Sequence, residues 1–267
     1  MTMPRVSIIM GAYNCADVVG NAIESIQNQT FEDWEFIICD DCSKDNTYKV
    51  VKTYADNDSR IILIQNEKNC HLAYTLNHCL SMARCEYVAR MDADDISQPY
   101  RLAEQVAFLD AHPEYSVVGC GVTLYDDSGD RQILFNKEEP VVKDMIYGVP
   151  FFHPTIMMRR AVYQALGGYV VSERTRRGQD LDLWFRFFAK GFKGYNIHEP
   201  LLKYHDDLND YGKKNSFKMA WGTTQTLFLG FRANHFPFYY YFWTLVPIIT
   251  ACMPRPIVYY IHKKHAR

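Results

Sequence analysis

The 267-residue sequence lacks the glycine-rich loops with which many nucleotide enzymes bind phosphate, since neither G-x-G-x-x-G nor G-x-x-x-x-G-K-[ST] occurs. It also lacks internal repeats, low-complexity linkers and, at its start, the apolar segment of a secretory leader. A net charge of only −2 argues against a general nucleic-acid binder. With 22% charged and 48% hydrophobic residues, the composition excludes a collagen, a coiled coil or a wholly disordered chain.

Paired zinc-binding cysteine motifs are missing as well. The eight cysteines are scattered, mostly within apolar runs, and the one C-x-x-C, Cys39–Cys42, has no second pair at zinc spacing. This usage predicts reduced thiols with structural roles rather than a disulfide framework.

What the sequence does contain is a regular alternation of expected strands and helices. Short β-branched runs predict strands at Val6–Met10, Trp34–Cys39, Ile61–Gln65 and Tyr87–Met91. Helical spacing of apolar residues predicts helices at Val18–Ile26, Asn46–Ala55, Ala73–Ala83, Arg101–Leu109 and Leu181–Phe188, with further strands at Ser116–Leu124 and Ile156–Met158. The β-α-β-α order predicts an α/β fold, a mostly parallel Rossmann-like sheet with helices on both faces.

Polar clusters follow each of the first four expected strands. They are Gly11-Ala12-Tyr13-Asn14, Asp40-Asp41-Cys42-Ser43, Asn66-Glu67-Lys68-Asn69 and Asp92-Ala93-Asp94-Asp95. Ligands of such sheets sit at the carboxyl ends of the strands, so these clusters converge on one candidate site. Because two clusters are acidic, a phosphate ligand there requires a divalent cation between the charges.

The triplet Asp92-Ala93-Asp94 is the sharpest local feature. In an extended segment residues i and i+2 point the same way, so both carboxylates can face one Mg²⁺ or Mn²⁺ ion. Such a triplet alone is more often a solvated turn, and Asp40 with Asp41 alone more often caps a helix or turn. Asp180 alone is most simply an acid at a helix N-terminus.

Several ordered motifs together resemble family 2 (GT2) glycosyltransferases with the GT-A fold. The similar segments are residues 4–14, 25–30, 40–47, 91–95 and 99–102; residues 153–155 and 179–184 resemble acceptor-side motifs of bacterial capsule and exopolysaccharide transferases. The resemblance covers about residues 4–210. It implies a GT-A domain at 1–210, divided into a nucleotide-binding half (1–111) and an acceptor half (112–210).

On the donor side, the resemblance implies that Tyr13 packs on the nucleotide base and that Asp41, beside Asp40, accepts a hydrogen bond from a uracil-type ring nitrogen. Asp92 touches the ribose or the metal shell, and Asp94 ligates the metal. The implied nucleotide-binding set also contains Gly11, Ala12, Asn69 and Ala93. The family often has glycine where His71 and Cys85 stand.

On the acceptor side, Asp180 occupies the position of the catalytic base. A sugar hydroxyl is hardly acidic, so a base within hydrogen-bond reach is needed as the new bond forms. Gln179 replaces the acid that commonly precedes this base, and His205 stands where relatives often have arginine. His205 could contact the diphosphate or donor, or lie at the surface; His153 shapes the acceptor pocket or is structural.

The C-terminal part differs in character, and we expect residues 211–267 to form a basic, aromatic, membrane-associating tail. Residues 233–254 contain no charged side chain, but prolines interrupt them. Nine Lys/Arg against three Asp/Glu give residues 201–267 a net charge of +6, so residues 1–200 carry −8. This pattern favours a helix lying in the membrane interface over a span. A helical lid on the catalytic domain is the alternative.

These expectations combine into an inverting, Mn²⁺- or Mg²⁺-dependent transferase. It would move a sugar from a nucleotide-diphospho-sugar, expected to be a UDP-sugar, to a hydroxyl of a lipid-linked saccharide. Its place would be the cytoplasmic face of the inner membrane, peripheral or monotopic, in biosynthesis of a capsule, exopolysaccharide or lipopolysaccharide. The alternative is a non-catalytic nucleotide-sugar-binding subunit of a polysaccharide assembly complex.

Overall fold

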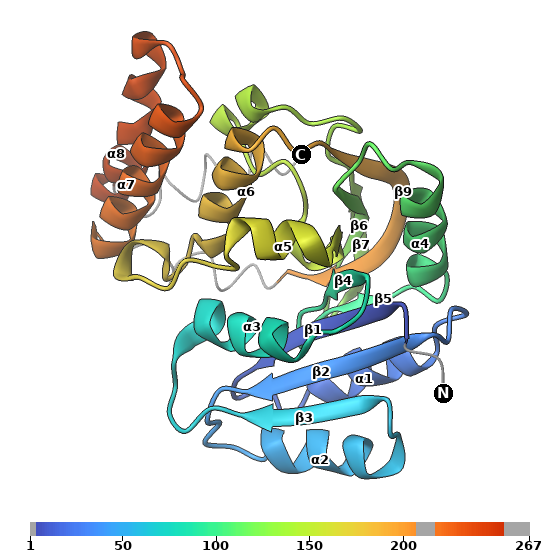
Figure 1. Cartoon of the computed structure of the whole chain (residues 1–267). Coiled ribbons are helices and arrows are strands. Elements are labelled where there is room, and N and C mark those ends of the chain that lie inside the picture. The colour runs from blue at the N-terminus through green and yellow to red at the C-terminus, as the bar shows by residue number, and fades with distance from the viewer. Residues whose placement is uncertain (1–3, 207–216, 254–267) are drawn as a thin grey trace.

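The structure, a computed structural model, describes residues 4–206 and 217–253 and is built on one nine-stranded sheet (Figure 1). The strand order is β3-β2-β1-β4-β8-β6-β9-β5, with β7 paired to β6. The strands are β1 (Val6–Ala12), β2 (Trp34–Asp40), β3 (Ile61–Gln65), β4 (Tyr87–Arg90), β5 (Ile96–Ser97), β6 (Val117–Asp126), β7 (Gly129–Leu134), β8 (Met157–Arg159) and β9 (Gly194–His205).

Helices connect and cover these strands. The α-helices are α1 (Val19–Gln27), α2 (Thr47–Asn57), α3 (His71–Met82), α4 (Arg101–Ala111), α5 (Arg160–Leu166), α6 (Gln179–Ala189), α7 (Phe217–Ala233) and α8 (Val246–Cys252). Short 3-10 turns lie at η1 (Val142–Ile146), η2 (His153–Thr155), η3 (Glu173–Thr175) and η5 (Phe238–Leu245).

The first half of the sheet is parallel, as the strand and helix alternation predicts. β1 pairs in parallel with β2 and β4, and β2 pairs in parallel with β3. In Figure 1, α3 covers one face of these strands while α1 and α2 cover the other. The carboxyl ends of β1, β2 and β3 therefore meet at one edge.

The second half of the sheet is mixed, which the sequence pattern did not indicate. β8 runs antiparallel to β4 and β6, β7 is antiparallel to β6, and β5 is antiparallel to β9. β9 is parallel to β6, with register shifts on both sides of Gly121. These pairings bring the end of β9 next to the segment that follows β4.

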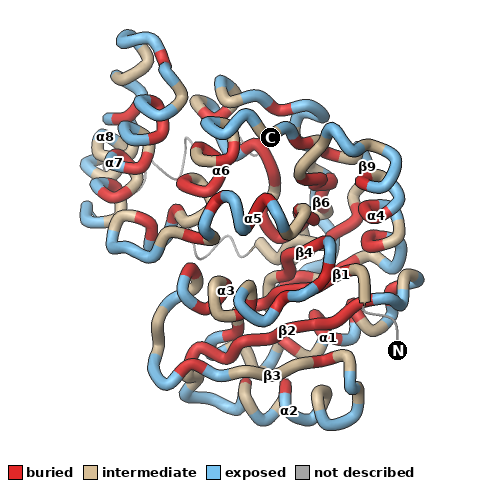
Figure 2. Tube along the Cα trace, in the orientation of Figure 1, coloured by how far each residue is buried: buried red, intermediate tan, exposed pale blue. Residues whose placement is uncertain are grey.

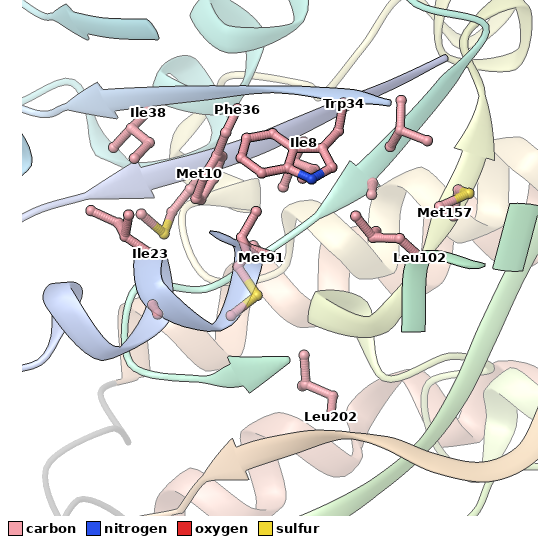
Figure 3. Close-up of a cluster of buried hydrophobic side chains, with 14 of the residues drawn as sticks. Ile8, Met10, Ile23, Trp34, Phe36, Ile38, Met91, Leu102, Met157 and Leu202 are labelled. Carbon is pink, nitrogen blue, oxygen red and sulfur yellow. The ribbon is translucent and has the colours of Figure 1, made fainter. Parts of the chain in front are cut away.

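Two apolar cores lie on the two faces of the sheet. The first joins α1, α2 and α4 to the strands; Figure 3 shows part of it, in which Trp34, Phe36 and Met91 pack together. The second joins α3, α5 and α6 to the other face and includes Trp184 and Phe185. Figure 2 shows the buried trace running along the central strands.

The described part of the tail has one docked side and one exposed side. Phe231 of α7 is buried against Phe185 of α6, with ring centroids 5.8 Å apart. A Cβ added at Gly230 would lie 2.2 Å from the Phe185 ring, so the two helices approach very closely here. Large apolar side chains remain exposed on α7, η5 and α8, among them Phe217, Trp221, Phe228, Phe238, Phe242, Trp243 and Ile249. Among the described helices, none combines the length and apolarity needed to cross a membrane.

Candidate active site

The loops after β1 and β2 are tied to each other at the carboxyl edge of the sheet. The amide of Asn14 donates to Ser43 Oγ over 3.0 Å, and Asn14 Oδ1 accepts from the Lys44 amide over 2.8 Å. Asn14 has a left-handed backbone (φ 49°), which asparagine tolerates better than most residues. Tyr13, directly after β1, keeps 42% of its surface exposed, so its ring is accessible to a flat ligand.

The adjacent carboxylates Asp40 and Asp41 are both buried but differ in their partners. Asp41 Oδ1 accepts hydrogen bonds from the Asn66 side chain and the Cys70 amide, and its Oδ2 accepts from the His71 amide, all at 2.8 Å. Asp41 therefore fixes the N-terminal turn of α3. Asp40 Oδ2 accepts from Gln65 and Ser43, whereas its Oδ1 has no hydrogen-bond partner among the described residues. Of the pair, Asp40 thus has the oxygen left for a further donor.

Gly11, a member of the predicted nucleotide set, lies where β1 packs closely on α3. A Cβ at Gly11 would lie 3.0 Å from Leu72 and 3.1 Å from Thr75, so glycine allows α3 to approach β1. His71 has φ 65°, in the left-handed region that favours glycine, although histidine is one of the residues enriched there. Ala12 and Ala93 contribute their methyl groups to the first core. Nucleotide contacts at these alanines would therefore use the backbone.

Asp92 is held by a buried arginine that the sequence analysis did not single out. Arg90, in the last position of β4, is 1% exposed and makes an ion pair with Asp92 Oδ1. It also donates to the Met91 carbonyl oxygen. An arginine within an otherwise apolar strand, two residues before the acidic triplet, was the available sequence signal. The ion pair fixes one carboxylate oxygen of Asp92. The side chain of Asp94 is more exposed to solvent than that of Asp92.

Two carboxylates, Asp94 and Asp95, and the imidazole of His205 gather beside this pair. Burial and the charge of Asp92 raise the pKa of Asp94, and burial with the charges of Asp92 and Asp94 raises that of Asp95 well above its usual range. Asp95 Oδ1 accepts from the His205 amide over 3.0 Å, and its Oδ2 has no partner among the described residues. His205 Nδ1 lies 3.9 Å from Asp94 Oδ2.

This crowding of negative charge suits a divalent cation, because a cation would relieve the repulsion that raises the two pKa values. Within residues 4–206 and 217–253, no group of three side chains has the geometry of a complete metal site. Mg²⁺ and similar ions commonly take one or two carboxylates and complete their shell with water and substrate phosphates. Asp94, with Asp92 or His205 beside it, fits that incomplete type of site.

Asp180 lies in the first turn of α6, close enough to this group for the charges of Arg90 and Asp92 to act on it. Burial raises its pKa, Arg90 lowers it, and Asp92 raises it again, so these charges lie within electrostatic range of one another. Its Oδ1 accepts from the Leu181 amide over 2.8 Å, and no residue in the described ranges hydrogen-bonds to its Oδ2. Gln179 beside it is half-buried. The neighbouring Asp182 is instead structural, since Arg174 and Arg186 occupy its two oxygens at 2.7 Å.

His153 belongs to a buried network with the hydroxyl groups of Tyr169 and Tyr163. Its Nε2 is 2.9 Å from the Tyr169 hydroxyl, which is 3.2 Å from the Tyr163 hydroxyl. Burial lowers the pKa of His153 well below its usual range, so the ring is neutral. With 8% of its surface exposed and the Trp184 ring against it, His153 fits the structural alternative better than direct contact with an acceptor.

Comparison with known proteins decides the family. The sequence profile described as Glycosyl transferase family 2 matches residues 7–167, more than half of the chain. The chain belongs to glycosyl transferase family 2. It is a glycosyltransferase, and its GT-A fold is the one that the motifs predicted.

Relatives cover nearly the whole sequence. The Putative glycosyltransferase EpsE of Bacillus subtilis (strain 168) is 46% identical over 264 residues, which are 98% of this chain and 94% of that protein. WfaP of Escherichia coli, named a UDP-Glc:alpha-D-GlcNAc-diphosphoundecaprenol beta-1,3-glucosyltransferase, is 30% identical over 196 residues, covering 73% of this chain and 75% of WfaP.

Solved structures share the fold at low sequence identity. S. aureus TarS 1-349 in complex with UDP-GlcNAc aligns with a TM-score of 0.68 and 15% identity, over 92% of this chain and 90% of that one. The mannosyltransferase PcManGT from Pyrobaculum calidifontis, in complex with GDP-Man and Mn2+, aligns with a TM-score of 0.64 and 19% identity, over 100% of this chain and 81% of the other.

Proposed function

We propose that this glycosyltransferase is inverting and depends on a divalent cation, and that it transfers a sugar from a UDP-sugar to a hydroxyl of a lipid-linked saccharide in surface polysaccharide biosynthesis. One observation carries the proposal: Asp180 and Asp92 lie within electrostatic range of each other and of Arg90. A base with a raised pKa therefore faces the acidic triplet expected to hold the donor diphosphate.

In the proposed reaction, the acceptor hydroxyl oxygen attacks the anomeric carbon of the donor. Asp180 accepts the hydroxyl proton as the new C–O bond forms, and the bond from the anomeric carbon to the nucleoside diphosphate breaks with its electron pair leaving on the diphosphate. A single displacement inverts the anomeric centre. The raised pKa of Asp180 strengthens it as a base.

On the donor side, Asp94 with Asp92 or His205 would hold Mn²⁺ or Mg²⁺. The cation would supply positive charge against the charge that develops on the leaving diphosphate. Tyr13 would stack on the base, and the unpartnered Oδ1 of Asp40 makes this residue a stronger candidate than Asp41 for accepting the ring N–H. The UDP-GlcNAc complex of TarS and the GDP-Man and Mn2+ complex of PcManGT support a nucleotide-sugar and a metal in this fold.

The acceptor proposal rests on relatives and on the tail. WfaP is named for a diphosphoundecaprenol acceptor, and EpsE for glycosyl transfer alone. The exposed aromatic residues of η5, with Tyr147 6.3 Å from Trp243 between ring centroids, support residues 211–267 as a membrane-associating tail. We place the protein at the cytoplasmic face of the inner membrane, attached from one side. Four basic residues that contribute to the positive charge of this tail, Arg255, Lys263, Lys264 and Arg267, lie outside the described residues.

Asp180→Asn tests the catalytic proposal. A panel of UDP- and GDP-sugars is offered with Mn²⁺ and a GlcNAc-diphospholipid acceptor, and release of nucleoside diphosphate is measured. The variant should be at least about 100-fold slower, because it removes the proton acceptor. Its stabilisation by UDP and Mn²⁺ in a melting experiment should match the wild type. Asp56→Asn, at an exposed carboxylate on α2, is the control and should leave both readings unchanged.

Asp94→Ala tests the metal and should abolish the Mn²⁺-dependent part of the UDP stabilisation. Undiminished turnover by Asp180→Asn would refute the base assignment. Wild-type protein that binds UDP and Mn²⁺ but turns over no donor would favour a non-catalytic binding subunit. For the tail, flotation with anionic liposomes should recover the wild type, whereas Phe242→Ser with Trp243→Ser should remain in the aqueous fraction.

A further inference from the structure

A basic pocket of about 280 Å³ lies between the η3 segment and the first turns of α7. Its charged lining consists of Glu173, Arg174, Arg176, Arg177 and Lys218. Four positive side chains therefore face one negative one. The pocket is not part of the carboxylate edge described above, and neither the proposed donor contacts nor the proposed base uses its arginines.

Two of the four cations are already paired. Arg174 makes a 2.7 Å ion pair with Asp182, and Lys218 makes a 2.6 Å ion pair with Glu173. Arg176 and Arg177 are exposed, and neither has a hydrogen bond or ion pair to any residue in the described ranges. Arg176 acts on Glu173 only through its charge, as one of the smaller causes of the lowered pKa of that carboxyl. Within the described part of the chain, the pocket therefore has two guanidinium groups without a counter-charge of their own.

The walls of the pocket are firmly held. Asp182 joins Arg174 of the η3 segment to Arg186 of α6, and Arg174 also donates to Thr226 of α7 over 3.1 Å. A Cβ at Gly222 would lie 2.8 Å from the Arg174 carbonyl oxygen, so α7 packs directly on this segment. The free arginines thus project from a backbone fixed on two sides, which reduces the entropy lost when they bind a ligand.

The position of the pocket suggests which anion it receives. Arg177 precedes Asp180 by three residues, a stretch of chain that spans at most about 11 Å, so the arginine end of the pocket lies close to the proposed base. At the other end, α7 exposes Phe217 and Trp221 on either side of Lys218. A ligand that joins a sugar, a phosphate and an apolar chain matches this order: the proposed base, then the arginines, then the exposed aromatic side chains of α7.

We propose that Arg176 and Arg177 bind the phosphate groups of a diphospholipid acceptor and so position its sugar hydroxyl at Asp180. This assignment rests on the proposed function. Paired guanidinium groups bind phosphate oxygens through charge-assisted, often bidentate hydrogen bonds. The donor diphosphate is a poorer match, because the acidic strand-end edge would hold it through a cation, whereas this pocket supplies positive charge without metal.

Farnesyl diphosphate, which has the diphosphate and an apolar chain but no sugar, tests the pocket by isothermal titration calorimetry in EDTA with the full chain. The wild type should bind it, and farnesol should bind far more weakly. Arg176→Gln and Arg177→Gln should each weaken binding roughly tenfold, and the double variant about 100-fold. Arg232→Gln, at an exposed arginine in the last turn of α7, is the matched control and should bind like the wild type.

A second reading separates this proposal from the proposed function. Stabilisation by UDP and Mn²⁺ should be the same in the double variant as in the wild type. Equal farnesyl diphosphate affinity in the two proteins would overturn the assignment. So would a double variant that loses UDP and Mn²⁺ binding while keeping farnesyl diphosphate, since the pocket would then serve the donor. Because the calorimetry needs neither donor nor turnover, it reads the pocket even if the transfer reaction is wrongly assigned.

Discussion

Replacing Arg90 with methionine should destabilise the protein strongly, because it leaves Asp92 without its buried partner. The guanidinium is 1% exposed and the Asp92 side chain 31% exposed. Removing one partner of a buried ion pair typically costs about 3–5 kcal/mol. Water can reach part of Asp92, so we expect about 3 kcal/mol, at the lower end of this range. For a chain of this size, that corresponds to a fall in melting temperature of roughly 6–12 °C.

Thermal and urea unfolding at pH 7, followed by circular dichroism, measure this loss. Asp92→Asn combined with Arg90→Met should recover part of the stability, because the stranded charge is then gone; the double-mutant cycle gives the coupling energy. Lys52→Gln, which breaks an exposed pair with Asp56, is the control and should not change the melting temperature measurably.

The same substitution should shift the pH dependence of the reaction. Arg90 lowers the pKa of Asp180, so its removal should raise that pKa further and move the acid limb of the kcat/KM profile to higher pH.

An Arg90→Met variant that melts within about 2 °C of the wild type would refute the structural argument, since it would show that water solvates the charge of Asp92 well enough without Arg90.

Substitutions at three further positions test local features. His71→Gly should preserve or raise stability, because glycine adopts φ 65° without strain, whereas His71→Val should lower the melting temperature. Hydrogen bonds from Arg60 lower the pKa of Asp58 to about 2, so Asp58→Asn should cost about 1 kcal/mol at pH 7, discounted for partial exposure. Urea titrations should show this difference in full above about pH 4 and its loss as the pH falls through the folded pKa of about 2, because below it Asp58 is protonated in both the folded and the unfolded state. Gly230→Ala puts a Cβ 2.2 Å from the Phe185 ring and should loosen α7, which limited proteolysis would detect as faster cleavage near residues 217–233.

The parallel half of the fold could be predicted because its strands are buried on both faces. Each of β1, β2 and β4 is an almost continuous apolar run, and burial of this kind leaves a direct signal in the sequence. β9 could not be predicted in the same way. Its twelve residues include polar side chains and Pro200, and it pairs with β6 through two register shifts, so neither alternation nor an apolar run marks it.

The candidate site likewise contains residues that the sequence predicts and residues whose environment depends on tertiary structure. The positions of Tyr13, Asp94 and Asp180 follow from the ends of predicted elements, so the sequence indicated them. The different environments of Asp40 and Asp41 could not be foreseen, because they depend on amides about thirty residues further along the chain. Whether each carboxylate caps α3 or keeps a free oxygen is decided by how the loop after β3 folds back, which is a tertiary property.

The near-neutral net charge conceals two regions of opposite charge, for which we propose two different ways of holding phosphate. The donor edge is acidic, with Asp92, Asp94 and Asp95 together, and needs a cation to accept a diphosphate. The pocket at Arg176 and Arg177 is positive and needs none. If both proposals hold, EDTA should abolish UDP binding while leaving farnesyl diphosphate binding intact, and high salt should weaken chiefly the second, because exposed guanidinium groups are screened more than a metal-bridged contact.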